Sequence, residues 1–175
     1  EEEADDGKVA PTLRGWKKDG RVKYIGVTHY TPSAFAELEA VLRAEPLDFI
    51  GIDYAVDNRE VEATILPLAQ ERKIGVLVYL PFGRTRLWER VRGHEVPAWA
   101  AEFDARSWAQ FFLKFVLAHA AVTAVTPATR RVEHLLDTSL TVLLDGRADL
   151  ARMGGGLLDD AVADLLLTAL EQRVV

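Results

Sequence analysis

The sequence contains no cysteine among its 175 residues. It therefore has neither disulfides nor thiolate metal sites, a composition that fits a reducing compartment, and we expect a cytoplasmic protein. No stretch approaches the ~20 consecutive apolar residues of a transmembrane helix, so we expect no membrane partner. The first six residues include three glutamates and two aspartates, opposite in sign to the basic start of a signal peptide.

The chain also lacks a continuous basic run. Its 21 lysines and arginines are scattered among 27 acidic residues, which gives a formal net charge of −6. A nucleic-acid backbone needs a clustered basic footprint, so we expect no nucleic-acid partner. Hydrophobic residues make up 49% and charged residues 27%, the balance of an ordinary globular protein. The length allows one compact domain.

What is present is a repeated alternation of β-rich runs and amphipathic segments. Apolar runs predict four strands, at 24–28, 47–54, 74–80 and 122–126. Helical periodicity and capping residues predict helices at 11–18, 32–44, 58–71 and 108–118, with shorter helices near 97–103 and 132–137. Residues 81–106 interrupt the alternation with a long loop, and such loops are usually functional or mobile.

Strand–helix–strand units whose strands are continuously apolar favour a parallel sheet. We therefore expect an α/β fold, a partial (β/α)8 TIM-barrel-like fold of about four parallel βα units, too few to close a barrel. An acidic leader at 1–10 precedes this half barrel at 11–138. A C-terminal extension at 139–175 is expected to be helical and to take part in assembly, with a glycine-rich joint at 153–156 and a leucine-rich helix at 157–173.

Three segments of the chain resemble the aldo-keto reductases. Residues 21–28 resemble the family's fifth barrel strand, 78–83 the seventh strand with its cofactor-facing loop, and 125–129 the eighth strand. Residues 47–58 then stand in the place of the sixth strand and 108–118 in that of the seventh helix. The resemblance covers about residues 11–138 and implies the C-terminal half of the barrel, strands five to eight.

The resemblance also implies what to expect of catalysis and cofactor. The family's reductases use an Asp, Tyr, Lys and His tetrad on strands two to four, which we expect this chain to lack. Two amide positions that hold the nicotinamide carboxamide correspond here to His29 and Gly51. We therefore expect no cofactor, with NADP as the alternative. The residues that would bind it are Thr28, Tyr79, Thr129, Arg130 and Arg131.

Candidate site residues lie where the predicted strands end, because ligands of parallel sheets and barrels meet the carboxyl ends of the strands. We predict catalytic roles for His29, Asp53 and Tyr79, since an imidazole, a carboxylate in an apolar strand and a phenol can transfer protons near neutral pH. The predicted substrate-binding residues are Tyr30, Tyr54, Asp57, Arg84 and Trp88. Each has a purely structural alternative as a cap, an ion-pair partner or a packing residue.

The remaining histidines, His94, His119 and His134, have no metal-ligand spacing and are interpreted as structural; we expect no metal site. A lone half barrel leaves open sheet edges and an uncovered apolar inner face. Leaving a few hundred Å² uncovered forfeits several kcal/mol at ~25 cal/mol per Å², which is comparable to the net stability of a domain. We therefore expect a homodimer, with a different partner chain or closure by the C-terminal region as alternatives.

Three functions are compatible with the sequence. The first is a repurposed enzyme that performs non-redox acid–base chemistry, such as a cyclisation, isomerisation or elimination of a small organic molecule in an assembled dimer. The second is an NADP-dependent carbonyl reductase whose other half comes from elsewhere. The third is a non-catalytic binding or scaffold subunit. Tight binding of NADPH would favour the second function over the first.

Overall fold

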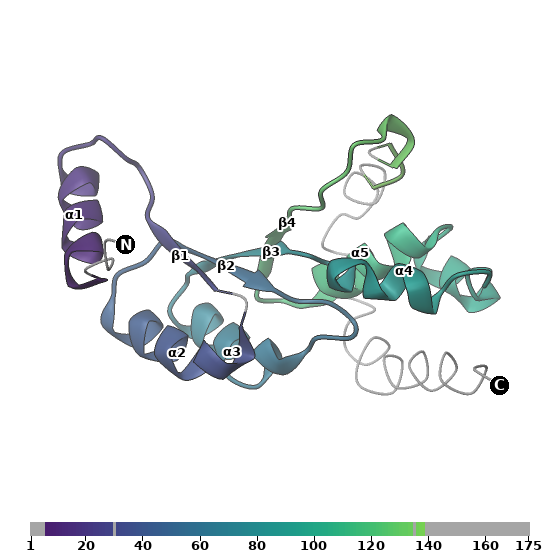
Figure 1. The fold of residues 1–175 in the computed structure, drawn as a ribbon, viewed down its shortest axis with the longest axis horizontal. Helices are drawn as coiled ribbons and strands as arrows, with labels where there is room; N and C mark the ends of the chain where they lie inside the picture. The colour runs from purple at the N-terminus through teal and green to yellow at the C-terminus, as the bar shows by residue number, and fades with distance from the viewer. Residues whose placement is uncertain (1–5, 30, 135, 139–175) are drawn as a thin grey trace, which may run out of the picture.

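The computed structural model describes residues 6–29, 31–134 and 136–138. Its centre is a four-stranded parallel sheet in the order β1-β2-β3-β4, formed by β1 (Gly26–His29), β2 (Phe49–Asp53), β3 (Gly75–Tyr79) and β4 (Val122–Val125). Each strand lies inside or within one residue of its predicted range. The fold is the predicted α/β half barrel, in which consecutive strands are neighbours in the sheet (Figure 1).

The helices lie before the first strand and in the crossovers between consecutive strands. They are α1 (Asp6–Lys18), α2 (Phe35–Ala44), α3 (Ile65–Glu71), α4 (Arg86–Arg90) and α5 (Trp108–Ala118), with short 3₁₀ turns η1 (Pro32–Ala34), η2 (Glu60–Glu62), η3 (Gly83–Thr85) and η4 (Ala98–Phe103). Helices α2 and α3 lie side by side on one face of the sheet, whereas α4 and α5 lie toward its β3–β4 end (Figure 1). Among the described residues, no helix is both long and apolar enough to cross a membrane.

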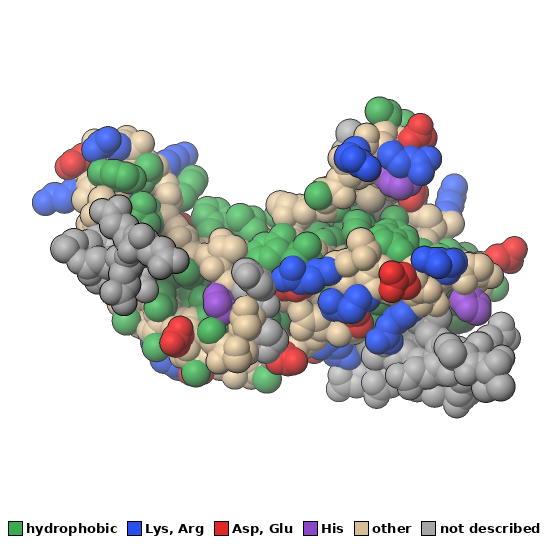
Figure 2. Space-filling view, in the orientation of Figure 1, with side chains coloured by type: hydrophobic (Ala, Val, Ile, Leu, Met, Phe, Trp, Pro, Cys, Tyr) green, Lys and Arg blue, Asp and Glu red, His purple; other side chains and the backbone are tan. Residues whose placement is uncertain are grey.

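The two faces of the sheet differ in burial because side chains alternate along each strand. Ile50, Ile52, Val76 and Val78 point to the helix-covered face and are fully buried. On the opposite face, Phe49, Leu77 and Tyr79 are partly exposed. Hydrophobic side chains gather in the hollow of this inner face, between α1 and the segment after β4 (Figure 2). Within the described ranges no element covers this inner face, as the sequence predicted (Figure 1).

Three predicted helix starts need correction. The helix expected at 11–18 already includes Asp6, the first described residue, and has Pro11 inside it. The fixed φ of proline is compatible with a helix there, although its ring removes one backbone hydrogen bond. The helix expected from residue 58 begins only at Ile65. Ala55 and Asn58 instead exchange backbone hydrogen bonds of 3.2 and 3.0 Å, so Asn58 closes a tight turn. Helix α2 likewise starts after a 3₁₀ turn at Pro32–Ala34.

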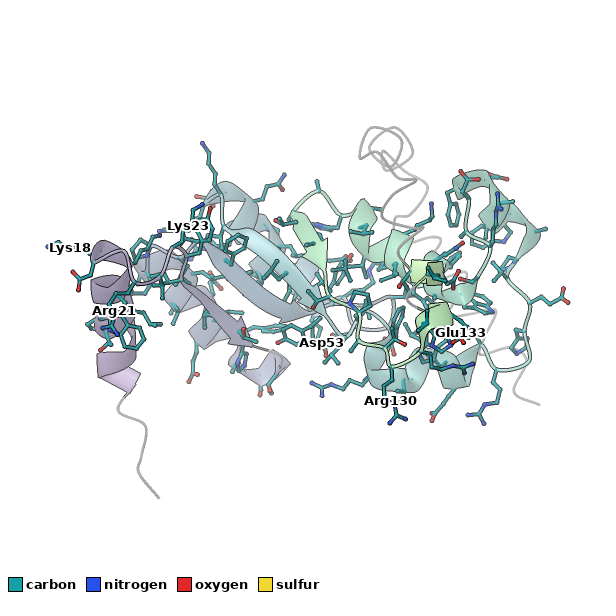
Figure 3. All side chains as sticks on the ribbon, turned by 90° about the horizontal axis from the view of Figure 1, so that it is seen from above. Lys18, Arg21, Lys23, Asp53, Arg130 and Glu133 are labelled. Atoms are coloured by element: carbon teal, nitrogen blue, oxygen red, sulfur yellow. The ribbon has the colours of Figure 1, made fainter. Side chains whose placement is uncertain are left out.

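The segment 81–106 is more regular than the predicted loop, because it contains η3, α4 and η4. Residues 132–134 and 136–138 are helical, which agrees with the short helix predicted there. The predictions for 139–175, including the helix at 157–173, lie outside the described residues. Helix α1 is tied to the chain before β2 by ion pairs of Arg14 with Glu45 and of Lys17 with Asp48. Lys18 and Arg21 lie at the end of the molecule opposite Arg130 (Figure 3).

Candidate functional site

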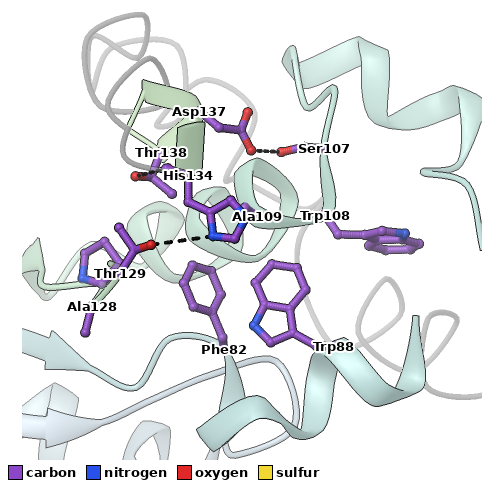
Figure 4. Close-up of a pocket in the computed structure, with 11 residues that line it drawn as sticks. Phe82, Trp88, Ser107, Trp108, Ala109, Ala128, Thr129, His134, Asp137 and Thr138 are labelled. Atoms are coloured by element: carbon purple, nitrogen blue, oxygen red, sulfur yellow. Dashed lines mark hydrogen bonds between the residues drawn. The ribbon is translucent and has the colours of Figure 1, made fainter. Parts of the chain in front are cut away.

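A cavity of about 450 Å³ opens at the β3–β4 end of the molecule. Its walls come from the segment after β3, the first turn of α5 and the segment after β4 (Figure 4). The lining residues are Phe82, Trp88, Ser107, Trp108, Ala109, Pro127, Ala128, Thr129, His134, Asp137 and Thr138. Its volume lies in the range of small-molecule sites, and such sites typically combine aromatic walls with a few polar groups.

The aromatic wall of the cavity is fixed by ring packing. Phe82 and Trp88 have ring centroids 4.9 Å apart, and Trp88 meets Phe112 edge-on at 5.7 Å. Trp108 stacks on Phe112 at 5.6 Å, and its indole Nε1 donates a hydrogen bond of 2.8 Å to the carbonyl of His94. These rings offer a preorganised apolar surface against which a flat ligand can stack.

The polar wall of the cavity is organised by Ser107 and Asp137. Ser107 caps α5 by accepting a 3.1 Å hydrogen bond from the N–H of Gln110, and its hydroxyl donates to Asp137 Oδ2 at 2.6 Å. The amide of Gln110 donates to Asp137 Oδ1 at 2.8 Å. Thr129 Oγ1 lies 3.5 Å from His134 Nδ1 (Figure 4). The carboxylate is thus held by the helix start, while the threonine and imidazole face the cavity.

The predicted cofactor residues fall into two groups. Thr129 lines the cavity, and the exposed Arg130 and Arg131 follow it along the same segment; Arg131 Nε lies 3.6 Å from a carboxylate oxygen of Glu133. Thr28 and Tyr79 lie instead on the inner face of the sheet. They flank Gly51 there, since a Cβ at that glycine would lie 2.9 Å from Thr28 Oγ1 and 3.2 Å from Tyr79 Cε1.

The predicted catalytic residues do not share one face. Asp53 and Tyr79 are register partners in adjacent strands, so their side chains point to the same, inner face. His29 follows Thr28 in β1 and therefore points to the helix-covered face, where its Nε2 lies 3.1 Å from the carbonyl of Thr31. The alternation therefore does not bring the His29 side chain together with those of Asp53 and Tyr79. The main-chain carbonyl of His29 does meet the site, because it accepts a 2.7 Å hydrogen bond from the Tyr79 hydroxyl.

Two buried carboxylates lie close to the end of β2. The Asp53 side chain is 5% exposed and lies 3.5 Å from Arg84 Nε, and that of Asp57 is 3% exposed and accepts a 2.9 Å hydrogen bond from Arg86 Nε. Burial raises the pKa of Asp53 above its ordinary value, although the neighbouring Asn58, Arg84 and Arg86 act in the opposite direction. The Oδ1 atoms of both aspartates are buried without a hydrogen-bond partner.

Of the predicted substrate-binding residues, Trp88 lines the cavity, whereas Asp57 and Arg84 belong to the neighbouring charged cluster. Tyr30 lies outside the described residues. Tyr54 belongs to a different, buried network: its hydroxyl donates to Glu62 Oε1 at 2.7 Å, and burial raises its pKa. The Tyr54 hydroxyl thus donates within a buried network, and Tyr54 is not among the residues that line the cavity.

Sequence reasoning missed several cavity residues. The sequence predicts Ser107 and Trp108 only as the start of the helix at 108–118 and Phe82 only as part of the segment 78–83. His134 is predicted as structural. Ser107 could have been recognised as a candidate from the sequence, because it stands at a helix start beside the long loop. The N-terminus of a helix can bind an anion through its free N–H groups. Among the described residues, no group of three or more potential metal ligands comes together.

Known proteins resemble this chain in both sequence and fold. The profile of the aldo/keto reductase family matches residues 2–143. A probable aldo-keto reductase of Glycine max is 33% identical over 72 residues, which cover 41% of this chain and 20% of that protein. Among solved structures, a glycerol dehydrogenase of Gluconobacter oxydans has a TM-score of 0.64 at 18% identity, covering 100% of this chain and 58% of that one.

A thermostable aldo-keto reductase solved with the inhibitor epalrestat has a TM-score of 0.59 at 21% identity, over 83% of this chain and 52% of its own. The chain thus spans little more than half the length of these solved structures and one fifth of the curated relative. These solved structures share the fold, and the family profile covers most of the sequence. On these grounds the chain belongs to the aldo/keto reductase family.

Proposed function

We propose that this chain is the cofactor-binding part of an NADP-dependent carbonyl reductase. The observation that carries the proposal is the aromatic cavity at the β3–β4 end, where Thr129 and His134 face Phe82 and Trp88. Two exposed arginines, Arg130 and Arg131, follow the cavity wall directly in the sequence. Aromatic faces bind a flat purine and guanidinium groups bind phosphate, so the residues fit the adenosine end of NADP.

The inner face provides for the other end of such a cofactor. Tyr79 has its hydroxyl tied to the carbonyl of His29, so its ring is held in place beside Gly51. A fixed ring of this kind orients a flat partner by stacking. Gly51 brings no amide to the site, so the nicotinamide end rests on stacking and on Thr28. When bound, NADPH supplies a hydride; the described residues bind and orient it, and the proton donor is proposed to come from a further part of the barrel.

The proposal is tested by titrating the full chain with NADPH and with NADH, following the quenching of tryptophan fluorescence. We expect saturable binding in which NADPH is preferred about tenfold, the size of one charge-assisted contact to the 2′-phosphate. An Arg130→Gln, Arg131→Gln double variant should bind both nucleotides equally. Equal weak quenching by both nucleotides in the unmodified chain would contradict the proposal.

A second candidate function is supported by Asp53. Burial raises its pKa, and it lies beside Tyr79 on the inner face, as a general acid for non-redox chemistry on a small organic molecule would require. His29 takes no part in this version, because its side chain points to the other face. The NADPH titration separates the two functions, since acid–base chemistry without redox requires no nicotinamide. The homodimer and the scaffold role of the inner face both stay proposals. The mass of the chain in solution tests whether the inner face binds a second copy.

A further inference from the structure

The segment that joins β3 to α4 follows an unusual backbone path. Gly83, Arg84 and Thr85 have φ angles of 57°, 52° and 82°, three consecutive residues in the left-handed region, and Leu80 precedes them with φ 60°. Residues other than glycine avoid this region because Cβ crowds the following carbonyl oxygen. Such a path persists only where the surroundings impose it. The turn at 83–85 therefore needs an anchor outside itself.

Asp57 lies against this turn, beside Gly83 and Arg86. One carboxylate oxygen, Oδ2, accepts the 2.9 Å hydrogen bond from Arg86 Nε, at the end of the turn. The other, Oδ1, lies where it would be 2.5 Å from a Cβ added at Gly83. The carboxylate thus holds Arg86, the residue directly after the turn, by charge. It also occupies the space beside Gly83, where a side chain would otherwise lie.

The same segment forms the aromatic wall of the cavity. Phe82 immediately precedes the turn and Trp88 lies in α4 two residues beyond Arg86; both line the cavity, with ring centroids 4.9 Å apart. We propose that Asp57, acting through Arg86 and Gly83, is a positioning residue that fixes the turn and thereby the distance between these two rings. Where it concerns nucleotide binding, this inference rests on the proposed function; where it concerns the turn, it stands alone.

The test is hydrogen exchange of the backbone amides of 82–90 in the full chain, compared among the unmodified protein, Asp57→Asn, Arg86→Gln and the double variant. Each single variant should speed exchange in this segment about tenfold, the size expected for the loss of a charge-assisted hydrogen bond. The double variant should add little to either single one, because the two residues act as one unit. Arg86→Lys, which keeps the charge, should recover part of the protection.

Ligand binding gives a second readout. Asp57→Asn should raise the dissociation constant of NADPH about tenfold while exchange in β2 and β3 stays at the level of the unmodified protein. Glu39→Gln is the matched control, because Glu39 also pairs with an arginine, Arg43, at 2.8 Å, but on the exposed face of α2. That variant should change neither exchange at 82–90 nor NADPH binding.

Three results would overturn the inference: unchanged exchange at 82–90 in both single variants, faster exchange spread evenly over β2 and β3, or full additivity in the double variant. Should Asp57→Asn fail to fold, Gly83→Ala and Arg86→Gln test the same contacts, and the same local increase is expected in both. If the unmodified chain binds no NADPH, the proposed function fails, while the exchange experiment still decides the role of Asp57.

Discussion

Glu62 shows how single residues stabilise this half barrel away from the cavity. Its carboxylate accepts hydrogen bonds from the Tyr54 hydroxyl at 2.7 Å and from Arg59 at 2.9 and 2.7 Å. Arg59 also lies over the ring of Phe115, and the His119 ring meets Tyr54 edge-on at 5.9 Å. Burial lowers the pKa of His119, so this imidazole stays neutral at neutral pH. The network fastens the turn after β2 to the end of α5.

Tyr54→Phe tests this network. The variant keeps the ring packing but removes a hydrogen bond to a charged, partly buried acceptor, so the free energy of unfolding should fall by about 1.5 to 3 kcal/mol. Urea denaturation followed by circular dichroism measures it. Tyr24→Phe is the control, because Tyr24 is 56% exposed, and it should leave stability unchanged. Equal stability of the two variants would show that the Tyr54 hydroxyl contributes nothing.

Asp53→Asn tests the raised pKa of Asp53. Because burial raises the folded-state pKa of this carboxyl above the unfolded value, its ionisation disfavours the folded state. The protonated carboxyl of Asp53 favours the folded state. This contribution to the free energy of unfolding is complete below the unfolded-state pKa and is lost as the pH rises through the folded-state pKa. The asparagine variant should therefore gain stability relative to the unmodified chain between pH 3 and pH 7, measured by urea midpoints. A relative loss of stability over that interval would show that Arg84 outweighs burial.

At the scale of elements, the strands and α5 could be predicted because their signals are local. Ser107 caps a strongly apolar run, and the β-rich runs are bounded by charged or turn residues. The start of α3 could not be predicted in this way. Asn58 is a good helix cap by residue type, but its backbone is already paired with Ala55. The cavity also escaped prediction, since it needs α4 and α5 to pack together. His29 shows a further limit: its strand was right, but its face depends on which side the helices cover.

Ser107→Ala tests the start of α5. Ser107 caps the helix through the N–H of Gln110, and losing such a cap costs about 1 kcal/mol. The hydroxyl also holds Asp137, so NADPH binding to the cavity should weaken as well. Thr64→Ala is the matched control, because Thr64 stands at the N-cap of α3 without a side-chain cap hydrogen bond, and it should cost less. Thermal unfolding measures the stability of both variants. An equal loss of stability in the two would show that the side-chain cap of Ser107 is not the cause.

At the scale of the whole molecule, the described residues leave the inner face of the sheet partly exposed (Figure 2). Phe49 reaches across it toward β3, since a Cβ at Gly75 would lie 2.5 Å from the Phe49 ring. Tyr24 packs edge-on against Phe49 at 5.5 Å and is itself 56% exposed. An apolar surface of this kind is a site of association in soluble proteins. We propose that a second copy of the chain covers it where the further part of the barrel does not.

Leu77→Asp tests this assembly. Sedimentation of the unmodified chain at tens of micromolar should give twice the mass of one chain, and the aspartate should reduce it to one, because a charge on the inner face would be buried without a partner. Val41→Asp on α2 is the control, since Val41 is 37% exposed on the helix side, and it should keep the doubled mass. An unmodified chain of single mass would contradict the homodimer.

The central claim is that the cavity at the β3–β4 end binds the adenosine part of NADP. Amide chemical shifts in solution test it most directly, because they map bound NADPH on the protein. NADPH should cause saturable shifts concentrated at 82–88, 107–109 and 127–134, with none in α1. Shifts that are absent at saturating NADPH, or that concentrate on α1 and the segment before β1, would contradict it.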